Sequence, residues 1–148
     1  MDTQTTLLLV LLLPLVSAAV IALFLRKLPW VAAGVSVGAA GVGMALALVA
    51  ALGYAGEPVS AAATWLSFAL PGAGTFSVEM GFYFNDTAAL MVCMVTVVGF
   101  LIHVFSLGYM RHDGGMARFF GGLSIFMFSM LGIVLADNLF MIFVFWEL

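Results

Sequence analysis

The chain has 148 residues, of which 66% are hydrophobic and only 7% are charged, and its formal net charge is −3. A water-soluble domain cannot bury so large an apolar fraction, so the composition indicates a protein whose solvent is the lipid bilayer. Four cationic residues are too few for a nucleic-acid-binding surface, and the single cysteine, Cys93, excludes an internal disulfide. The sequence contains no nucleotide-binding or metal-binding motif.

Long apolar stretches predict membrane-spanning helices, because each can cross a hydrocarbon core of about 30 Å. We expect an all-α polytopic membrane protein with four transmembrane helices and the first half of a fifth. These helices are predicted at approximately residues 7–25, 30–54, 87–110, 118–136 and 138–148, the last incomplete. A helix that stops in hydrocarbon leaves carbonyl groups unsatisfied. We therefore expect residues 1–148 to be the N-terminal part of one longer membrane domain.

The cationic residues predict the orientation of the helices. Arg26 and Lys27 lie between the first two predicted spans, and Arg111 and Arg118 lie between the third and the fourth. Cytoplasmic loops carry an excess of lysine and arginine. Both cationic loops are therefore expected in the cytoplasm, and the N-terminus is expected outside.

A short β-hairpin is predicted over residues 65–84, between the second and third spans. Apolar and polar residues alternate from Thr75 to Phe84, and a Pro71-Gly72-Ala73-Gly74 turn precedes them. Alternation with a period of two beside a Gly/Pro turn is typical of a hairpin. We expect it on the outer face, flat over the helix ends with its apolar side down.

Small residues in the second span predict close helix packing. Gly34, Gly38 and Gly41 recur three and four residues apart. Small side chains at this spacing allow helices to approach closely in lipid. We expect this helix to pack inside a bundle, with a dimerisation face as the alternative.

Glu147 is the first candidate functional residue. Asp137 marks the junction of the fourth and fifth spans, near the outer surface, and Glu147 follows ten residues later. Ten residues of helix extend about 15 Å, which is half of the hydrocarbon core. A carboxylate at the midplane is costly and is by default a functional hypothesis. We therefore predict that Glu147 is a proton relay, with a structural hydrogen-bonded acid as the alternative.

Two further residues are candidates with open alternatives. His103 lies inside the third span, where it either makes an interhelical hydrogen bond or takes part in a proton relay. Asp137, beside Asn138, either helps to cap the fifth helix or lies at the outer mouth of a proton path.

From Asp86 onward, the residues resemble a known family. The motifs occur in order as Phe100-Leu101-Ile102-His103, Ser106-Leu107-Gly108-Tyr109-Met110, Arg118-Phe119-Phe120, Ser129-Met130, Ala136-Asp137-Asn138-Leu139 and Trp146-Glu147. They are similar to the L subunit of bacterial NADH-quinone oxidoreductase, respiratory complex I, whose mitochondrial counterpart is subunit five. This family comprises antiporter-like, proton-conducting membrane subunits.

The resemblance implies a role for the chain and its partners. It implies a proton-translocating subunit in the bacterial inner membrane, packed against other membrane subunits of complex I. NADH, FMN, iron–sulfur clusters and quinone would be bound by other subunits, with no cofactor or metal in this chain. Glu147 would pair with a lysine on a later helix, and His103 matches a histidine of the family's third helix.

Two alternatives remain open at this point. The ending Trp146-Glu147-Leu148 also resembles the large subunit of multi-subunit cation/proton antiporters, and a membrane-bound hydrogenase subunit is a related possibility. A small stand-alone structural membrane protein is the alternative from a different class.

Overall fold

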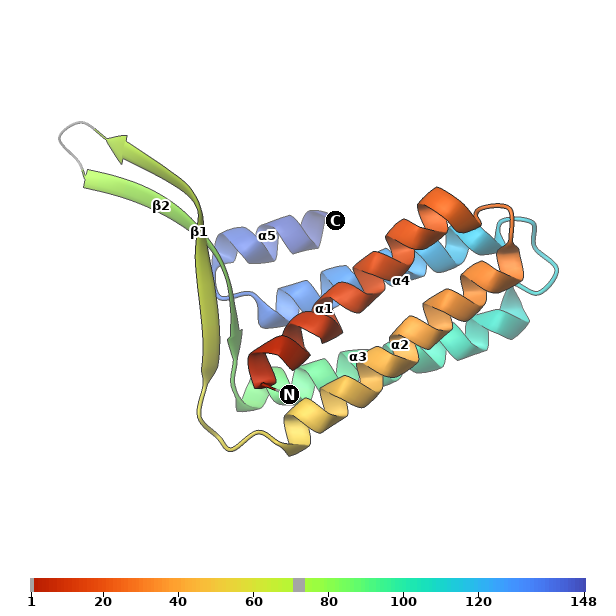
Figure 1. The fold of residues 1–148 in the computed structure, drawn as a ribbon, viewed down its shortest axis with the longest axis horizontal. Helices are drawn as coiled ribbons and strands as arrows, with labels where there is room; N and C mark the ends of the chain where they lie inside the picture. The colour runs from red at the N-terminus through yellow and green to blue at the C-terminus, as the bar shows by residue number, and fades with distance from the viewer. Residues whose placement is uncertain (1, 71–73) are drawn as a thin grey trace.

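The computed structural model describes residues 2–70 and 74–148. In chain order, the elements are α1 (Thr3–Val20), the π-helical turn η1 (Ile21–Leu25), α2 (Pro29–Leu52), β1 (Val59–Leu70), β2 (Gly74–Phe84), α3 (Asp86–Tyr109), α4 (Met116–Leu135) and α5 (Leu139–Glu147). The four long helices lie alongside one another, and the hairpin lies across one end of them (Figure 1).

Within the described residues, four helices are long and apolar enough to cross a membrane, as the sequence predicted: Thr3–Leu25, Pro29–Leu52, Asp86–Tyr109 and Met116–Leu135. The chain is therefore a mostly helical, multi-pass membrane protein. The observed helix ends differ from the predicted ones by a few residues, and local capping sets the starts of α2 and α3. Pro29 stands in the first turn of α2, where its missing N–H costs nothing. Asn85 caps α3 by accepting a hydrogen bond from the Ala88 N–H at 2.9 Å.

Small residues do line the packed face of α2, but they are not all the predicted ones. Ala33, Ser36 and Ala40 are buried, whereas a side chain at Gly34 or Gly38 would meet nothing within 4 Å. The buried positions follow the spacing of three and four residues that sets one helix face. The prediction of close packing was therefore right for the helix and wrong for two of its three glycines.

The hairpin is longer than predicted. β1 and β2 pair antiparallel from Val59 opposite Phe84 to Leu70 opposite Gly74, so the first strand begins at Val59 and not at residue 65. Alanine-rich sequence has low β-propensity, and pairing with β2 overrides it here. Of the predicted turn, residues 71–73 lie outside the described residues.

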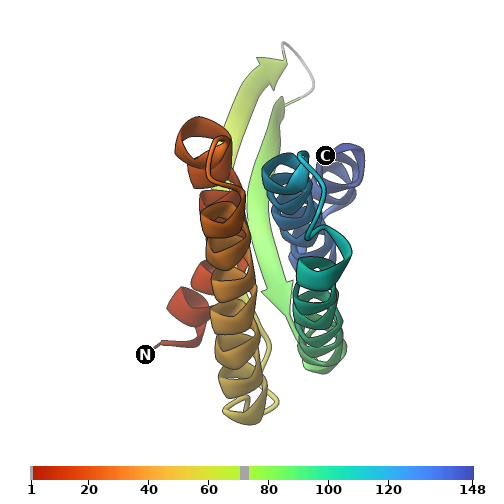
Figure 2. The same cartoon turned by 90° about the vertical axis from the view of Figure 1, so that its right-hand side faces the viewer.

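A β-bulge keeps the apolar side chains of the hairpin on one face. The register shifts between Thr64 and Leu66, so Trp65 is the extra residue. Near the bundle this face is buried through Phe82 and Phe84. Farther out, the hairpin extends past α5 (Figures 1 and 2), and Met80 on the same face is exposed. The expected apolar-side-down arrangement thus holds only for the half next to the helices.

The loops that carry the cationic residues lie at the end of the bundle opposite the hairpin. The link from η1 to α2 and the link from α3 to α4 are adjacent in Figure 1. All four lysine and arginine residues fall within or beside these two links.

Candidate functional site

The junction of α4 and α5 is held by Asn138. Its side-chain oxygen accepts a hydrogen bond from the Met141 N–H at 2.9 Å, which caps α5. Its amide nitrogen donates to the Glu79 carbonyl on β2 at 3.0 Å and to Asp137 Oδ1 at 2.6 Å. The cap of α5 is therefore Asn138 and not Asp137, and the same side chain ties the helix to the hairpin.

Asp137 lies where the hairpin meets this junction. Its side chain is exposed, and a Cβ added at Gly81 would overlap the Asp137 carboxylate. Beside it, Ala136 forms an isolated antiparallel bridge with Phe82 of β2. The close approach of strand and junction depends on Gly81 having no side chain.

Phe145 sets the rotation of α5 about its axis. Its side chain is only 9% exposed, and its ring lies against Gly132 of α4, where any Cβ would overlap the ring. The Phe128 ring packs edge-on against it, with the ring centroids 5.3 Å apart. Met141, one turn earlier, is also buried. The face of α5 that carries Met141 and Phe145 therefore points at α4.

Glu147 consequently faces away from α4. It follows Phe145 by two residues, or about 200° around a helix, and it is exposed. Its neighbours Trp146 and Leu148 line a hollow together with Gly122 and Ile125. These two residues lie near the middle of α4 (Met116–Leu135). The end of α5 is thus level with the middle of a membrane-spanning helix.

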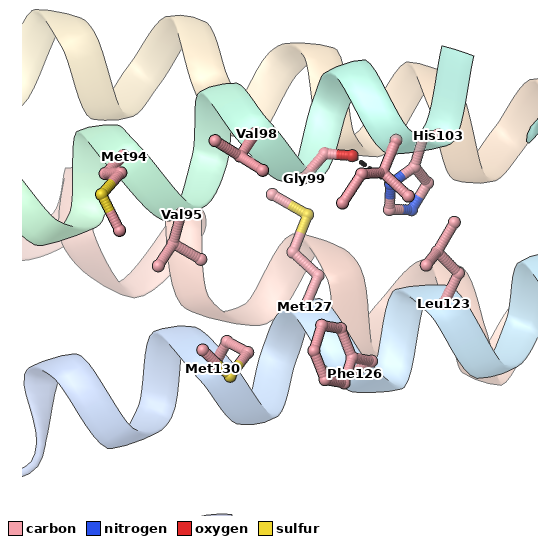
Figure 3. A pocket seen from close by; sticks show the side chains of 10 residues that line it. Met94, Val95, Val98, Gly99, His103, Leu123, Phe126, Met127 and Met130 are labelled. Carbon is pink, nitrogen blue, oxygen red and sulfur yellow. Dashed lines mark hydrogen bonds between the residues drawn. The ribbon is translucent and has the colours of Figure 1, made fainter. Parts of the chain in front are cut away.

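His103 is buried within the bundle on α3. Its Nδ1 lies 2.7 Å from the Gly99 carbonyl oxygen one turn earlier (Figure 3). Since a carbonyl oxygen only accepts, Nδ1 is assigned the proton, and Nε2 of the neutral ring is then an acceptor. This hydrogen bond is within one helix, and the described residues give His103 no interhelical hydrogen bond.

His103 lines a hollow of about 170 Å³ between α3 and α4. Figure 3 shows Met127 and Phe126 of α4 facing Val98 and His103 of α3. Phe126 and Met130 also line the hollow beside Trp146. The structure therefore does not bring His103, Asp137 and Glu147 together: apolar side chains of α4 separate His103 from α5, and Asp137 lies at the hairpin end.

Two hydroxyl groups join α2 and α4, which the sequence interpretation missed. Ser36 Oγ and Ser124 Oγ are 2.7 Å apart, and the Ser36 hydroxyl donates a hydrogen bond to the Phe120 carbonyl oxygen at 3.2 Å.

The sequence interpretation also missed the role of Gly132 in helix packing. A glycine inside an apolar helix was the available signal, since small residues mark close helix approach in membranes. The spacing of residues alone did not indicate that Gly132 packs against Phe145.

Part of the chain is similar in sequence to known proteins. Residues 70–120 match the family model described as NADH-ubiquinone oxidoreductase (complex I), chain 5 N-terminus. NAD(P)H-quinone oxidoreductase chain 5 of Synechocystis sp. is 46% identical over 76 residues, which is 51% of this chain and 11% of that protein. The chloroplastic subunit 5 of Chara vulgaris is 49% identical over 72 residues, or 49% of this chain and 11% of that protein.

A third relative gives the same result. Subunit 5 of Paulinella chromatophora, from its organellar chromatophore, is 46% identical over 81 residues, which is 55% of this chain and 12% of that protein. The resemblance to the N-terminal region of complex I subunit five is thereby confirmed. The chain spans about a tenth of the length of the curated relatives that it matches.

Proposed function

We propose that this chain is the N-terminal part of a proton-translocating membrane subunit of NADH-quinone oxidoreductase. The observation that carries the proposal is the match of residues 70–120 to the chain 5 family, together with 46% identity to a chain 5 protein. This resemblance favours the oxidoreductase over a cation/proton antiporter or hydrogenase subunit. As a subunit of that enzyme, the chain would couple electron transfer to proton movement without holding a redox group itself.

Glu147 is the residue that we propose loads and releases the proton. Its position level with the middle of α4 supports this role. A protonated carboxyl group is neutral and suits hydrocarbon, whereas the ionised form needs a cation or water beside it. Because Phe145 fixes the rotation of α5, the Glu147 carboxylate faces the side of α5 that no described helix covers. A cationic partner would therefore approach from that side.

His103 and Asp137 take secondary roles in the proposal. His103 borders the hollow between α3 and α4, and its neutral ring would accept a proton at Nε2. The apolar lining of the hollow offers no continuous polar path to Glu147. Asp137 would stand at the outer mouth of the proton path, beside the hairpin.

The proposed placement is a bacterial inner membrane, with the N-terminus and the hairpin outside. The two cationic links at the opposite end support this orientation. Other membrane subunits of the complex would be the partners. NADH, FMN, iron–sulfur clusters and quinone would be bound by other subunits of the complex.

The proposal is tested by Glu147→Gln in the assembled oxidoreductase. The amide keeps the shape of the side chain but cannot hold or release a proton at this position. We expect assembly and NADH oxidation to be retained more than proton pumping, measured as protons moved per NADH oxidised in sealed vesicles. Glu57→Gln, at an exposed position in the link between α2 and β1, is the matched control and should leave that ratio unchanged. An unchanged ratio and rate in Glu147→Gln would refute the relay role.

A further inference from the structure

A third hollow lies at the cationic end of the bundle, between the end of the first span and α4. It has a volume of about 150 Å³, and Arg26 and Arg118 are both among the residues that line it. Arg26 directly follows η1, and Arg118 lies in the first turn of α4. The two ends lie side by side in Figure 1. Two cationic residues from separate elements therefore border one hollow.

The local backbone explains why a hollow exists here. The π-helical turn η1 widens the end of the first span, and Gly121 and Gly122 remove two side chains from the facing surface of α4. Ile21 packs on Gly121, where a Cβ would lie 3.4 Å from its Cγ2 atom. A Cβ at Gly122 would meet nothing within 4 Å. No side chain therefore fills the part of the hollow next to Gly122.

The charge in the hollow is of one sign. Its lining contains Arg26 and Arg118 but no acidic residue, and the remaining lining residues are small or apolar. Both arginines are exposed. An arginine at the end of a membrane-spanning helix places its guanidinium group at the headgroup level. Guanidinium groups bind phosphate oxygens with paired, charge-assisted hydrogen bonds.

We propose that this hollow binds an acidic phospholipid. Its phosphate would lie between the guanidinium groups of Arg26 and Arg118, and one acyl chain would lie over Gly122 along Ile125. Basic pockets between membrane helices on the cytoplasmic side are suited to such headgroups. The apolar walls favour a lipid over free phosphate, because a free anion gains nothing from them. The proposal does not require a proton-conducting role of Glu147, but this hollow shares Gly122 and Ile125 with the hollow beside Trp146.

The preference of the protein for acidic over zwitterionic lipid tests whether Arg26 and Arg118 bind the headgroup. The protein is purified together with its associated subunits and placed in bilayers of phosphatidylglycerol and phosphatidylcholine. Spin-labelled forms of each lipid then measure which lipid is bound at the protein surface. Arg26→Gln and Arg118→Gln should each lower the preference for phosphatidylglycerol by about fivefold at this site. Lys27→Gln and Arg111→Gln are the matched controls: both residues lie at the same end but outside the hollow, and both variants should keep the preference. Equal effects from all four substitutions would indicate a diffuse surface charge and overturn the site.

The proposed position of the acyl chain is tested by a substitution that fills the hollow. Gly122→Leu should fold, because its Cβ meets no atom, and should exclude the acyl chain. Gly38→Leu, also at an open position in a helix, is the control. Inorganic phosphate should not displace the lipid, and displacement would assign the site to a free anion. A photoreactive residue at Ala22, which lines the hollow, should label lipid. Labelling of a polypeptide segment would show that protein fills the groove and would refute the proposal.

Discussion

The ring of Phe145 lies against Gly132, so α5 packs on α4 at a point where α4 has no side chain. This contact fixes both the rotation and the distance of α5. Since Glu147 comes two residues after Phe145, the contact also determines which side of the helix the carboxylate faces. A glycine on one helix thereby positions the proposed proton carrier on the next.

Gly132→Ala should therefore destabilise the protein. The added methyl group overlaps the Phe145 ring, and overpacking of this kind costs about 1–3 kcal/mol. Thermal unfolding in detergent measures the loss. Gly122→Ala on the same helix meets no atom and should be neutral or stabilising. Phe145→Leu should reduce the cost of Gly132→Ala, and a cost that is unchanged in that background would show that the ring is not the obstacle.

Asn138→Ala should loosen the start of α5. The substitution removes the cap on the Met141 N–H and the bond to the Glu79 carbonyl, and loss of a cap alone costs about 1 kcal/mol. Hydrogen exchange at the Met141 amide should become faster. Asp137→Asn keeps both of these bonds and is the control. Equal protection of Met141 in wild type and Asn138→Ala would contradict the assigned cap.

The hydroxyl pair of Ser36 and Ser124 should couple α2 to α4. Hydrogen bonds between membrane helices contribute about 0.6 kcal/mol on average. The 2.7 Å distance between the two Oγ atoms is that of a well-formed hydrogen bond between hydroxyl groups. A double-mutant cycle with Ser36→Ala and Ser124→Ala measures the coupling. Ser129→Ala provides a comparison, since Ser129 Oγ bonds within its own helix to the Ile125 carbonyl. Strict additivity of Ser36→Ala and Ser124→Ala would contradict the contact.

Gly81→Ala should weaken the contact between the hairpin and the α4–α5 junction. The new methyl group would overlap the Asp137 carboxylate and lie 2.9 Å from the Ala61 carbonyl oxygen. Protease cleavage within β1 should accelerate, because the strand pair can no longer sit against the junction. Ser77→Ala, on the same strand, should leave cleavage unchanged. Only partial rescue is expected from Asp137→Ala, since the Ala61 carbonyl remains.

Hydropathy and charge were sufficient to predict the four long helices, because the length of an apolar stretch is set by the bilayer itself. The sequence did not reveal that β1 starts at Val59, since Ser60 to Ala63 have weak strand preference and pair only through their register with β2. Nor did it reveal the cap at Asn138 rather than Asp137, because both side chains are good caps and only the backbone decides between them.

The position of Glu147 along α4 was predictable from the sequence, but the side that it faces was not. Counting residues from Asp137 gave the level of Glu147, because helical rise is constant. The side that Glu147 faces depends on the contact between Phe145 and Gly132, which are far enough apart in sequence that no helical spacing relates them. His103 illustrates the same limit: its bond to Gly99 is local, but local and interhelical partners are equally compatible with a histidine inside an apolar span.

In the proposed function, Glu147 gains and loses a proton during turnover. Infrared difference spectroscopy of the assembled oxidoreductase, with and without NADH, detects the carbonyl stretch of a protonated carboxyl group directly. We expect a carboxyl band that changes with turnover in wild type, shifts in heavy water and is absent in Glu147→Gln. A turnover-linked carboxyl spectrum that is identical in wild type and Glu147→Gln would contradict the account.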